Sequence, residues 1–118
     1  MYKIYGIKNC DTMKKAFNWL NDNKVEFEFH NYKTEGLSSE LLQSFIDLVG
    51  WQPLLNTKGT TWRKLDEATR QSIDNEVAAK ALMLENTSII KRPLLVKGKK
   101  ALLGFSTDGY QQFIKDTK

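Results

Sequence analysis

Apolar residues in the first third of the chain follow two different periods. Residues 2–7 alternate between two faces, which predicts a strand, and residues 25–30 alternate in the same way. Between them, residues 11–20 carry apolar side chains at helical spacing, and the polar residues 21–23 predict the end of that helix. A strand, a helix and a second strand predict a βαβ unit with parallel strands and a right-handed crossover.

The middle of the chain has helical rather than alternating patterns. Ser38 or Ser39 is expected to cap a helix that ends at Gly50, and residues 56–61 are predicted to form a polar loop. A short helix is expected within residues 65–73, and a longer helix is expected to begin at residue 74 or 75. The side chains of this longer helix that we expect to face the core are Val77, Ala78, Ala81, Leu82 and Leu84.

The last thirty residues predict a hairpin followed by a helix. Arg92 and Pro93 interrupt the helical pattern, and two short apolar segments at 94–96 and 101–104 flank a turn rich in lysine and glycine. A final helix is expected to begin at residue 106 or 107. The element order predicts one α/β domain over residues 1–118, with a four-stranded mixed sheet. In this prediction the core comprises residues 1–33 and 88–118, and residues 34–87 form a helical insertion.

Composition restricts the class of protein. The chain has 118 residues, of which 41% are hydrophobic and 27% charged, as in ordinary globular proteins and unlike disordered or collagen-like chains. No apolar run approaches the length of a membrane span, and the N-terminal residues lack the apolar segment of a signal peptide. We therefore expect a cytoplasmic protein that does not bind membranes.

Charge is distributed unevenly along the chain. The formal net charge is +4. Residues 1–33 and 91–118 are basic, whereas residues 34–90 have more acidic than basic side chains. If the two ends pack together, their surface would favour an anionic ligand. Basic residues do not alternate with aromatic ones, so nucleic acid is not the expected partner.

A lone cysteine is the main chemical signal. Cys10 excludes an internal disulfide and a multi-cysteine zinc site, and no metal site is expected. It opens the first predicted helix, where backbone N–H groups stabilise a thiolate, and Lys8 and Lys14 lie nearby in the sequence. A reactive nucleophile and an inert small apolar residue are both consistent with this position. His30, the single histidine, is either a base for Cys10 or an ordinary strand residue.

Three segments carry a resemblance to a known family. They are Tyr5-Gly6-Ile7-Lys8-Asn9-Cys10-Asp11-Thr12, Leu54-Leu55-Asn56-Thr57-Lys58-Gly59-Thr60-Thr61-Trp62-Arg63-Lys64-Leu65 and Ile89-Ile90-Lys91-Arg92-Pro93-Leu94-Leu95-Val96. Together they resemble the arsenate reductase (ArsC)/Spx family of thioredoxin-like proteins, and within it the YffB-type subgroup. The resemblance covers essentially the whole chain and implies a thioredoxin-like fold.

The resemblance also implies roles for individual residues. Cys10 matches the nucleophile of the reductases, Arg92 matches an arginine that holds the oxyanion, and Pro93 matches the cis-proline that follows it. We expect the Arg92–Pro93 bond to be cis and Arg92 to face Cys10. The remaining residues expected to bind substrate or glutathione are Lys8, Asn9, Asp11 and Thr12.

Two departures from the family pattern change the expected activity. The reductases have further arginines at the position of Asn56 and within residues 103–106, which here contain none, so arsenate reduction should be weak. The redox regulators have a second cysteine where this chain has Met13. A protein with a single thiol needs a second thiol from another molecule. This implies a monothiol oxidoreductase that uses glutathione. Glutaredoxin is a further candidate partner. We expect a monomer with no bound cofactor.

Two other functions stay open at this point. One is a true arsenate reductase that uses glutathione and glutaredoxin. The other is a non-catalytic regulator that, like the Spx proteins, binds RNA polymerase.

Overall fold

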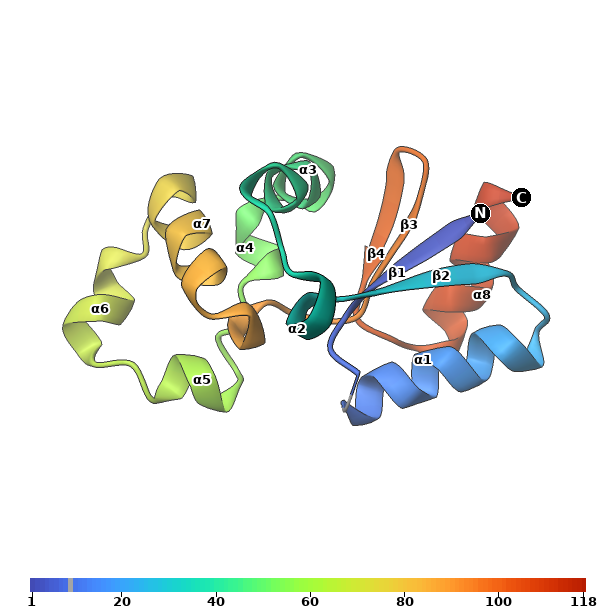
Figure 1. Ribbon diagram of the computed structural model, residues 1–118, viewed down its shortest axis with the longest axis horizontal. Helices are drawn as coiled ribbons and strands as arrows, with labels where there is room; N and C mark the ends of the chain where they lie inside the picture. The colour runs from blue at the N-terminus through green and yellow to red at the C-terminus, as the bar shows by residue number, and fades with distance from the viewer. Residues whose placement is uncertain (9) are drawn as a thin grey trace. The chain divides into compact units, whose positions relative to one another are not determined.

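A computed structural model describes residues 1–8 and 10–118. The chain divides into two compact units, each considered by itself (Figure 1). Unit 1 comprises residues 1–36 and 92–118, and unit 2 comprises residues 37–91.

Unit 1 is built on one sheet of four strands. They are β1 (Tyr2–Gly6), β2 (Phe27–Asn31), β3 (Leu94–Lys97) and β4 (Lys100–Leu103). Their order in the sheet is β2-β1-β3-β4, with β1 parallel to β2, and with β3 antiparallel to both β1 and β4. The predicted four-stranded mixed sheet is therefore confirmed.

Two long helices pack on one face of this sheet. Helix α1 (Asp11–Asp22) connects β1 to β2, and helix α8 (Thr107–Thr117) ends the chain. The apolar faces of these helices pack against the strand side chains that point to the same side of the sheet. The buried cluster consists of Tyr2, Ile4, Met13, Ala16, Leu20, Leu95, Tyr110 and Ile114. A one-turn helix, α2 (Tyr32–Glu35), follows β2 directly.

Unit 2 is almost entirely helical. It contains α3 (Ser39–Val49), α4 (Trp51–Leu54), α5 (Thr60–Arg63), α6 (Glu67–Ser72), α7 (Glu76–Glu85) and the 3-10 helix η1 (Thr87–Ile89). Polar side chains cap three of these helices, because Ser38, Asp66 and Asn75 each accept a hydrogen bond from the first turn. An isolated antiparallel bridge joins Leu55 to Ile90.

Three predictions about individual elements need correction. The second strand begins at Phe27 rather than at residue 25, because Lys24 has a φ of 56° and the Val25 N–H donates back to the Leu20 carbonyl. The predicted loop at 56–61 contains the start of α5. The one-turn helices α2 and α4, and η1, were not predicted from the sequence.

The inward face of α7 was predicted only in part, because Leu82 is buried as expected but other expected residues are not. Val77 is 80% exposed and Leu84 is 36% exposed, whereas Ala79, Leu82 and Met83 are buried. Apolar residues occur on most sides of this helix, so periodicity alone does not determine which side is buried. Among the described residues, no helix is long and apolar enough to span a bilayer.

Candidate functional site

Cys10 lies where the first strand passes into the first helix. It is the N-cap residue of α1, with an extended backbone (φ −114°, ψ 132°), and its side chain is partly buried. An N-cap residue precedes backbone N–H groups that have no partner within the helix. The thiol forms no full capping hydrogen bond, yet it faces these groups from the position where an anion is most stabilised.

The surroundings of Cys10 favour its ionised form. Burial alone would raise the pKa of the thiol, but the backbone N–H groups of Met13 and Thr12 and the hydrogen bond and charge of Arg92 outweigh it, so the pKa is lowered. The charged group that acts on the thiol is thus Arg92, rather than the sequence neighbours Lys8 and Lys14. A thiolate in a partly exposed position is the reactive form of cysteine.

The sheet topology explains why Arg92 reaches this point. Tyr5 pairs with Leu94 in the antiparallel β1–β3 ladder, and continuing this register places Pro93 beside Gly6. The Arg92–Pro93 bond is cis, as expected. Arg92 lies close to the end of β1, because a Cβ atom at Gly6 would be 3.5 Å from the Arg92 Cβ atom, an ordinary van der Waals contact.

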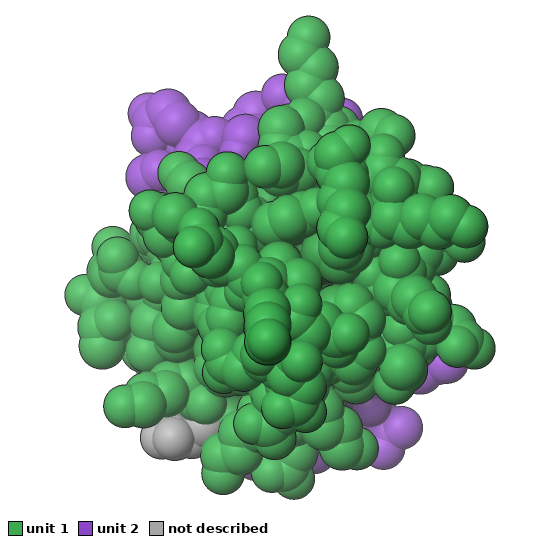
Figure 2. Space-filling view, turned by 90° about the vertical axis from the view of Figure 1, so that its right-hand side faces the viewer, with its two compact units in different colours: residues 1–36, 92–118 green, residues 37–91 purple. Residues whose placement is uncertain are grey.

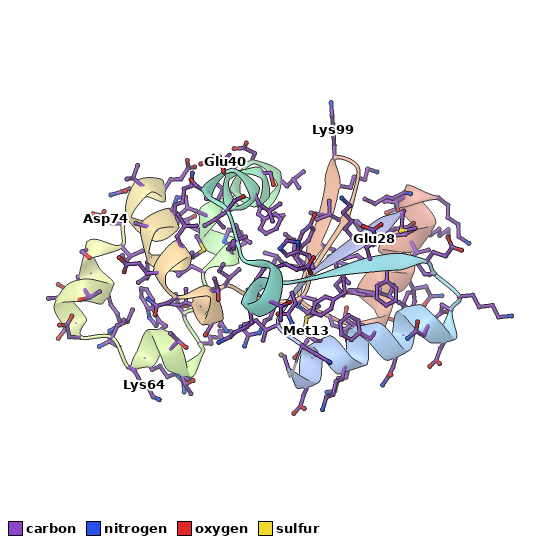
Figure 3. The ribbon with its side chains drawn as sticks, in the orientation of Figure 1. Met13, Glu28, Glu40, Lys64, Asp74 and Lys99 are labelled. Carbon is purple, nitrogen blue, oxygen red and sulfur yellow. The ribbon has the colours of Figure 1, made fainter. Side chains whose placement is uncertain are left out.

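The side chain of Met13 packs against the end of β1. Its side chain is fully buried and points from α1 towards the strands (Figure 3). A Cβ atom at Gly6 would lie only 2.5 Å from the Met13 sulfur, which is closer than packed atoms approach. The glycine at the end of β1 therefore fits the first turn of α1 against the sheet, with Cys10 at its start.

The other predicted site residues differ in exposure and in contacts. Lys8 is exposed in the turn after β1, Asp11 is the exposed first residue of α1, and Thr12 supplies a backbone N–H towards the thiol. Pro93 is buried, and its carbonyl accepts a hydrogen bond of 2.8 Å from the Gly104 N–H. Asn9 lies outside the described residues.

His30 has structural partners. Its Nε2 atom lies 2.8 Å from the Gly36 carbonyl oxygen, and its ring lies against that of Tyr5, with centroids 5.4 Å apart. It also meets the Tyr32 ring edge-on at 6.3 Å. These contacts tie the end of β2 to the turn that follows it, which is the role of an ordinary strand residue.

Tyr32 is a residue of the site region that was not predicted from the sequence. It is 3% exposed; burial raises the pKa of its hydroxyl, while the charge of Arg92 acts in the opposite direction. The topology could have indicated it, because β1 and β2 are parallel and their carboxyl ends meet at one edge of the sheet. The residues that directly follow β2 therefore lie on the same side as Cys10.

The described residues contain no group of three or more His, Cys, Asp or Glu side chains placed to hold a metal ion. The chemistry that this arrangement supports is that of one thiolate beside one guanidinium.

Comparison with known proteins places the chain in a family. The model of the ArsC family matches residues 5–113, which is nearly the whole sequence. The chain belongs to the ArsC family. Its sheet order, with the cysteine after the first strand and the cis-proline before the third, is the thioredoxin-like fold of that family.

Relatives confirm this assignment over the full length. A solved structure of a YffB protein superposes with a TM-score of 0.86 at 48% identity, covering 95% of this chain and 97% of the other. An ArsC-related protein from Brucella melitensis gives a TM-score of 0.79 at 46% identity, covering 97% and 94%. An uncharacterised protein of Haemophilus influenzae is 43% identical over 94% of this chain and 96% of its own length.

More distant relatives have a different described role. The global transcriptional regulator Spx of Streptococcus pyogenes is 27% identical, over 97% of this chain and 85% of its own length. The ArsC family thus includes proteins described as regulators, and membership alone does not define an activity.

Proposed function

We propose that this ArsC-family protein is a monothiol oxidoreductase that reduces small or protein-bound disulfides with glutathione, using the Cys10 thiolate. The observation that supports this most directly is the lowered pKa of the chain's single thiol at a helix N-terminus. An inert cysteine in an apolar core would have its pKa raised instead. The absence of a second cysteine in the sequence requires an external thiol, and glutathione is the proposed one.

The proposed reaction has two exchange steps. The Cys10 thiolate attacks a mixed disulfide between glutathione and a substrate thiol at the glutathione sulfur. A bond forms between Cys10 and glutathione, and the substrate leaves as a thiolate that takes up a proton. A second glutathione thiolate then attacks the glutathione sulfur of this intermediate, which releases glutathione disulfide and restores the Cys10 thiolate. Each turnover consumes one free glutathione, and the other half of the glutathione disulfide comes from the mixed disulfide.

Charge supports glutathione as the reductant. Glutathione carries two carboxylates, and the guanidinium of Arg92 is the charged group that acts at the thiol. Lys8, exposed in the turn two residues before Cys10, is the proposed partner of a second carboxylate. Asp11, also exposed, would repel such a ligand and limits how tightly it binds.

Mass spectrometry of the intact protein tests the first step. After incubation with glutathione disulfide, the wild-type chain should gain one glutathionyl group, and added reduced glutathione should remove it. Cys10→Ser should gain none, and a small free-thiol compound in the same buffer controls for the oxidant. An unmodified wild-type chain beside a modified control thiol would contradict the mechanism.

Arsenate reduction is the second activity to consider, because solved relatives include an ArsC-related protein. Arg92 is the single arginine of unit 1, and Asn56 stands at another position where the resemblance implies an arginine. Each missing charge-assisted contact costs about 1.5–3 kcal/mol. We therefore expect arsenate turnover in a glutathione- and glutaredoxin-coupled assay to be far below turnover of a mixed disulfide between glutathione and a substrate thiol. Equal turnover would contradict the preference for disulfides.

A further inference from the structure

A second site candidate lies in unit 1 at the end of α1 away from Cys10. A groove of about 870 Å³ lies beside the chain ends, and its lining includes residues from the last turn of α1 and from the full length of α8. The chain ends lie on the right of Figure 1, and Figure 2 views unit 1, in green, from that side. Helix α1 has twelve residues, so its two ends are separated by about 18 Å.

The floor of the groove is apolar and well supported. It includes Tyr2, Trp19, Val25 and Ile114. The Trp19 ring packs edge-on against the buried ring of Tyr110, with centroids 5.6 Å apart. The Tyr2 hydroxyl lies 2.7 Å from the Thr117 Oγ1 atom, which ties the floor to the last turn of α8. Tyr2 and Ile114 are only 9% and 8% exposed, so the apolar surface open to a ligand comes chiefly from the half-buried Trp19 and Val25.

Positive charges surround this floor. Lys24, Lys97, Lys115 and Lys118 line the groove, and Glu26 is the one acidic side chain among its lining residues. The Lys97 ammonium lies 4.9 Å from the centre of the Tyr2 ring, which places its charge directly over the floor. Met1 and Lys118 bring one terminal amine and one terminal carboxylate, whose charges offset each other.

The arrangement of the lysines indicates the kind of ligand. They belong to the α1–β2 turn, the end of β3 and the last turns of α8, so they are spread around the groove and do not converge on one point. Among the residues that the structure describes, no arginine lines the groove to provide a bidentate contact with a phosphate. The segment of α8 from Thr107 to Lys118 is about 16 Å long, which equals about five residues of extended peptide.

We propose that this groove binds an acidic peptide segment of a partner protein, with one large apolar side chain on the aromatic floor and flanking carboxylates among the lysines. Cys10 lies outside the groove, so binding here is independent of the proposed thiol chemistry. A partner held at this end of α1 would nonetheless remain within one helix length of the thiol.

A titration of the isotopically labelled full chain, followed by NMR, tests the proposal. The probe is a short peptide of Asp and Glu around one central Phe, with both ends blocked. Amide and indole signals of the floor residues should shift, whereas those around Cys10 should not. Replacing the central Phe by Ser should weaken binding, and raising the ionic strength should weaken it further.

Charge reversal provides the decisive comparison. Lys24→Glu combined with Lys115→Glu changes two exposed groove residues and should weaken peptide binding roughly tenfold or more. Lys99→Glu combined with Lys100→Glu makes the same change in charge outside the groove and should leave affinity nearly unchanged. Cys10→Ser should bind like the wild type, whether or not the thiol proves reactive.

Three results of these peptide titrations would overturn the proposal. They are equal losses for both lysine pairs, equal binding of the Phe and Ser peptides, and shifts confined to other parts of the chain. Stronger binding of a poly-dT oligonucleotide at the same residues would also overturn it, since that would make nucleic acid the occupant.

Discussion

The two ends of helix α1 differ in both charge and shape. At its start, one thiol faces the backbone N–H groups of Thr12 and Met13 and the guanidinium of Arg92. At its end, a groove has an aromatic floor and lysine side chains around it. The last turn of α1 contains no basic residue, so the lysines that offset the negative end of the helix dipole come from other elements.

This difference separates two requirements of a site. Stabilising a thiolate needs donors fixed at one atom, and the close packing of Gly6 against Met13 provides that rigidity. Binding a flexible acidic segment needs only an apolar surface and several charges around it. One end of unit 1 should therefore be sensitive to small changes in packing, and the other mainly to changes in charge.

The largest expected effects come from substitutions that change the packing at the Cys10 end of α1. Gly6→Ala should lower the free energy of unfolding by about 1–3 kcal/mol, because the new methyl group would overlap Met13. Met13→Ala should lower it by about 2–5 kcal/mol, because it leaves a cavity at a fully buried position. Urea unfolding followed by circular dichroism measures both.

The double variant is the control for this pair. In Gly6→Ala with Met13→Ala, the added methyl group partly fills the cavity, so the combined loss should be smaller than the sum of the single losses by about 0.5 kcal/mol or more. Additive losses would show that the two residues do not pack against each other.

The next largest effect is expected from removing a charge at the Cys10 end of α1. Arg92→Ala should raise the pKa of Cys10, because it removes the charged group that favours the thiolate. The pH dependence of alkylation measures this pKa, and the wild-type value should lie below the ordinary thiol value of about 8.5. Fewer thiolates would then be present near neutral pH, and the rate of alkylation there should fall.

Lysine variants sharpen the comparison between the two ends. Lys8→Ala and Lys97→Ala each remove one positive charge, the first near Cys10 in sequence and the second in the groove. Neither should change the pKa of Cys10 as Arg92→Ala does, since Arg92 is the charged group that acts on the thiol. An equal rise in all three variants would mean that overall charge, and not local geometry, controls the thiol.

The smallest effects are expected from two tyrosines near the groove. Tyr2→Phe should lower the free energy of unfolding by about 0.5–1.5 kcal/mol, because it removes the hydrogen bond with Thr117. Tyr110→Phe should leave it unchanged or raise it by up to about 1 kcal/mol, because the buried Tyr110 hydroxyl has no hydrogen-bond partner among the described residues. Thermal unfolding of both variants in one buffer compares them; a larger loss for Tyr110→Phe would contradict this assignment.

The sheet-containing unit could be predicted well from its sequence. Residues 2–31 change from period two to helical period and back, and each change marks an element that the structure contains. Unit 2 was harder to predict, because α4 and α5 have four residues each, which is too short to show a helical period. The exposed Val77 and Leu84 likewise show that an apolar residue in a helix need not face its core.

The two sites also differ in how well they could be predicted from the sequence. Cys10 and Arg92 were found because they lie in segments that resemble a known family, although 82 positions of sequence separate them. The groove has no such signal. Lys24, Lys97 and Lys115 come from three distant segments, and only the folded chain shows that they surround one aromatic floor.

The sheet order has a consequence for how the chain avoids aggregation. Strands β2 and β4 are the two edges of the sheet, where unpaired backbone groups could recruit another strand. Both are short, with five and four residues. The outward-facing Glu28 lies on β2, and Lys99 extends from the tip of the β3–β4 hairpin beside the exposed Lys100 (Figure 3). An incoming strand would have to bury a carboxylate at one edge or an ammonium group at the other, which discourages edge-to-edge stacking of copies of this chain.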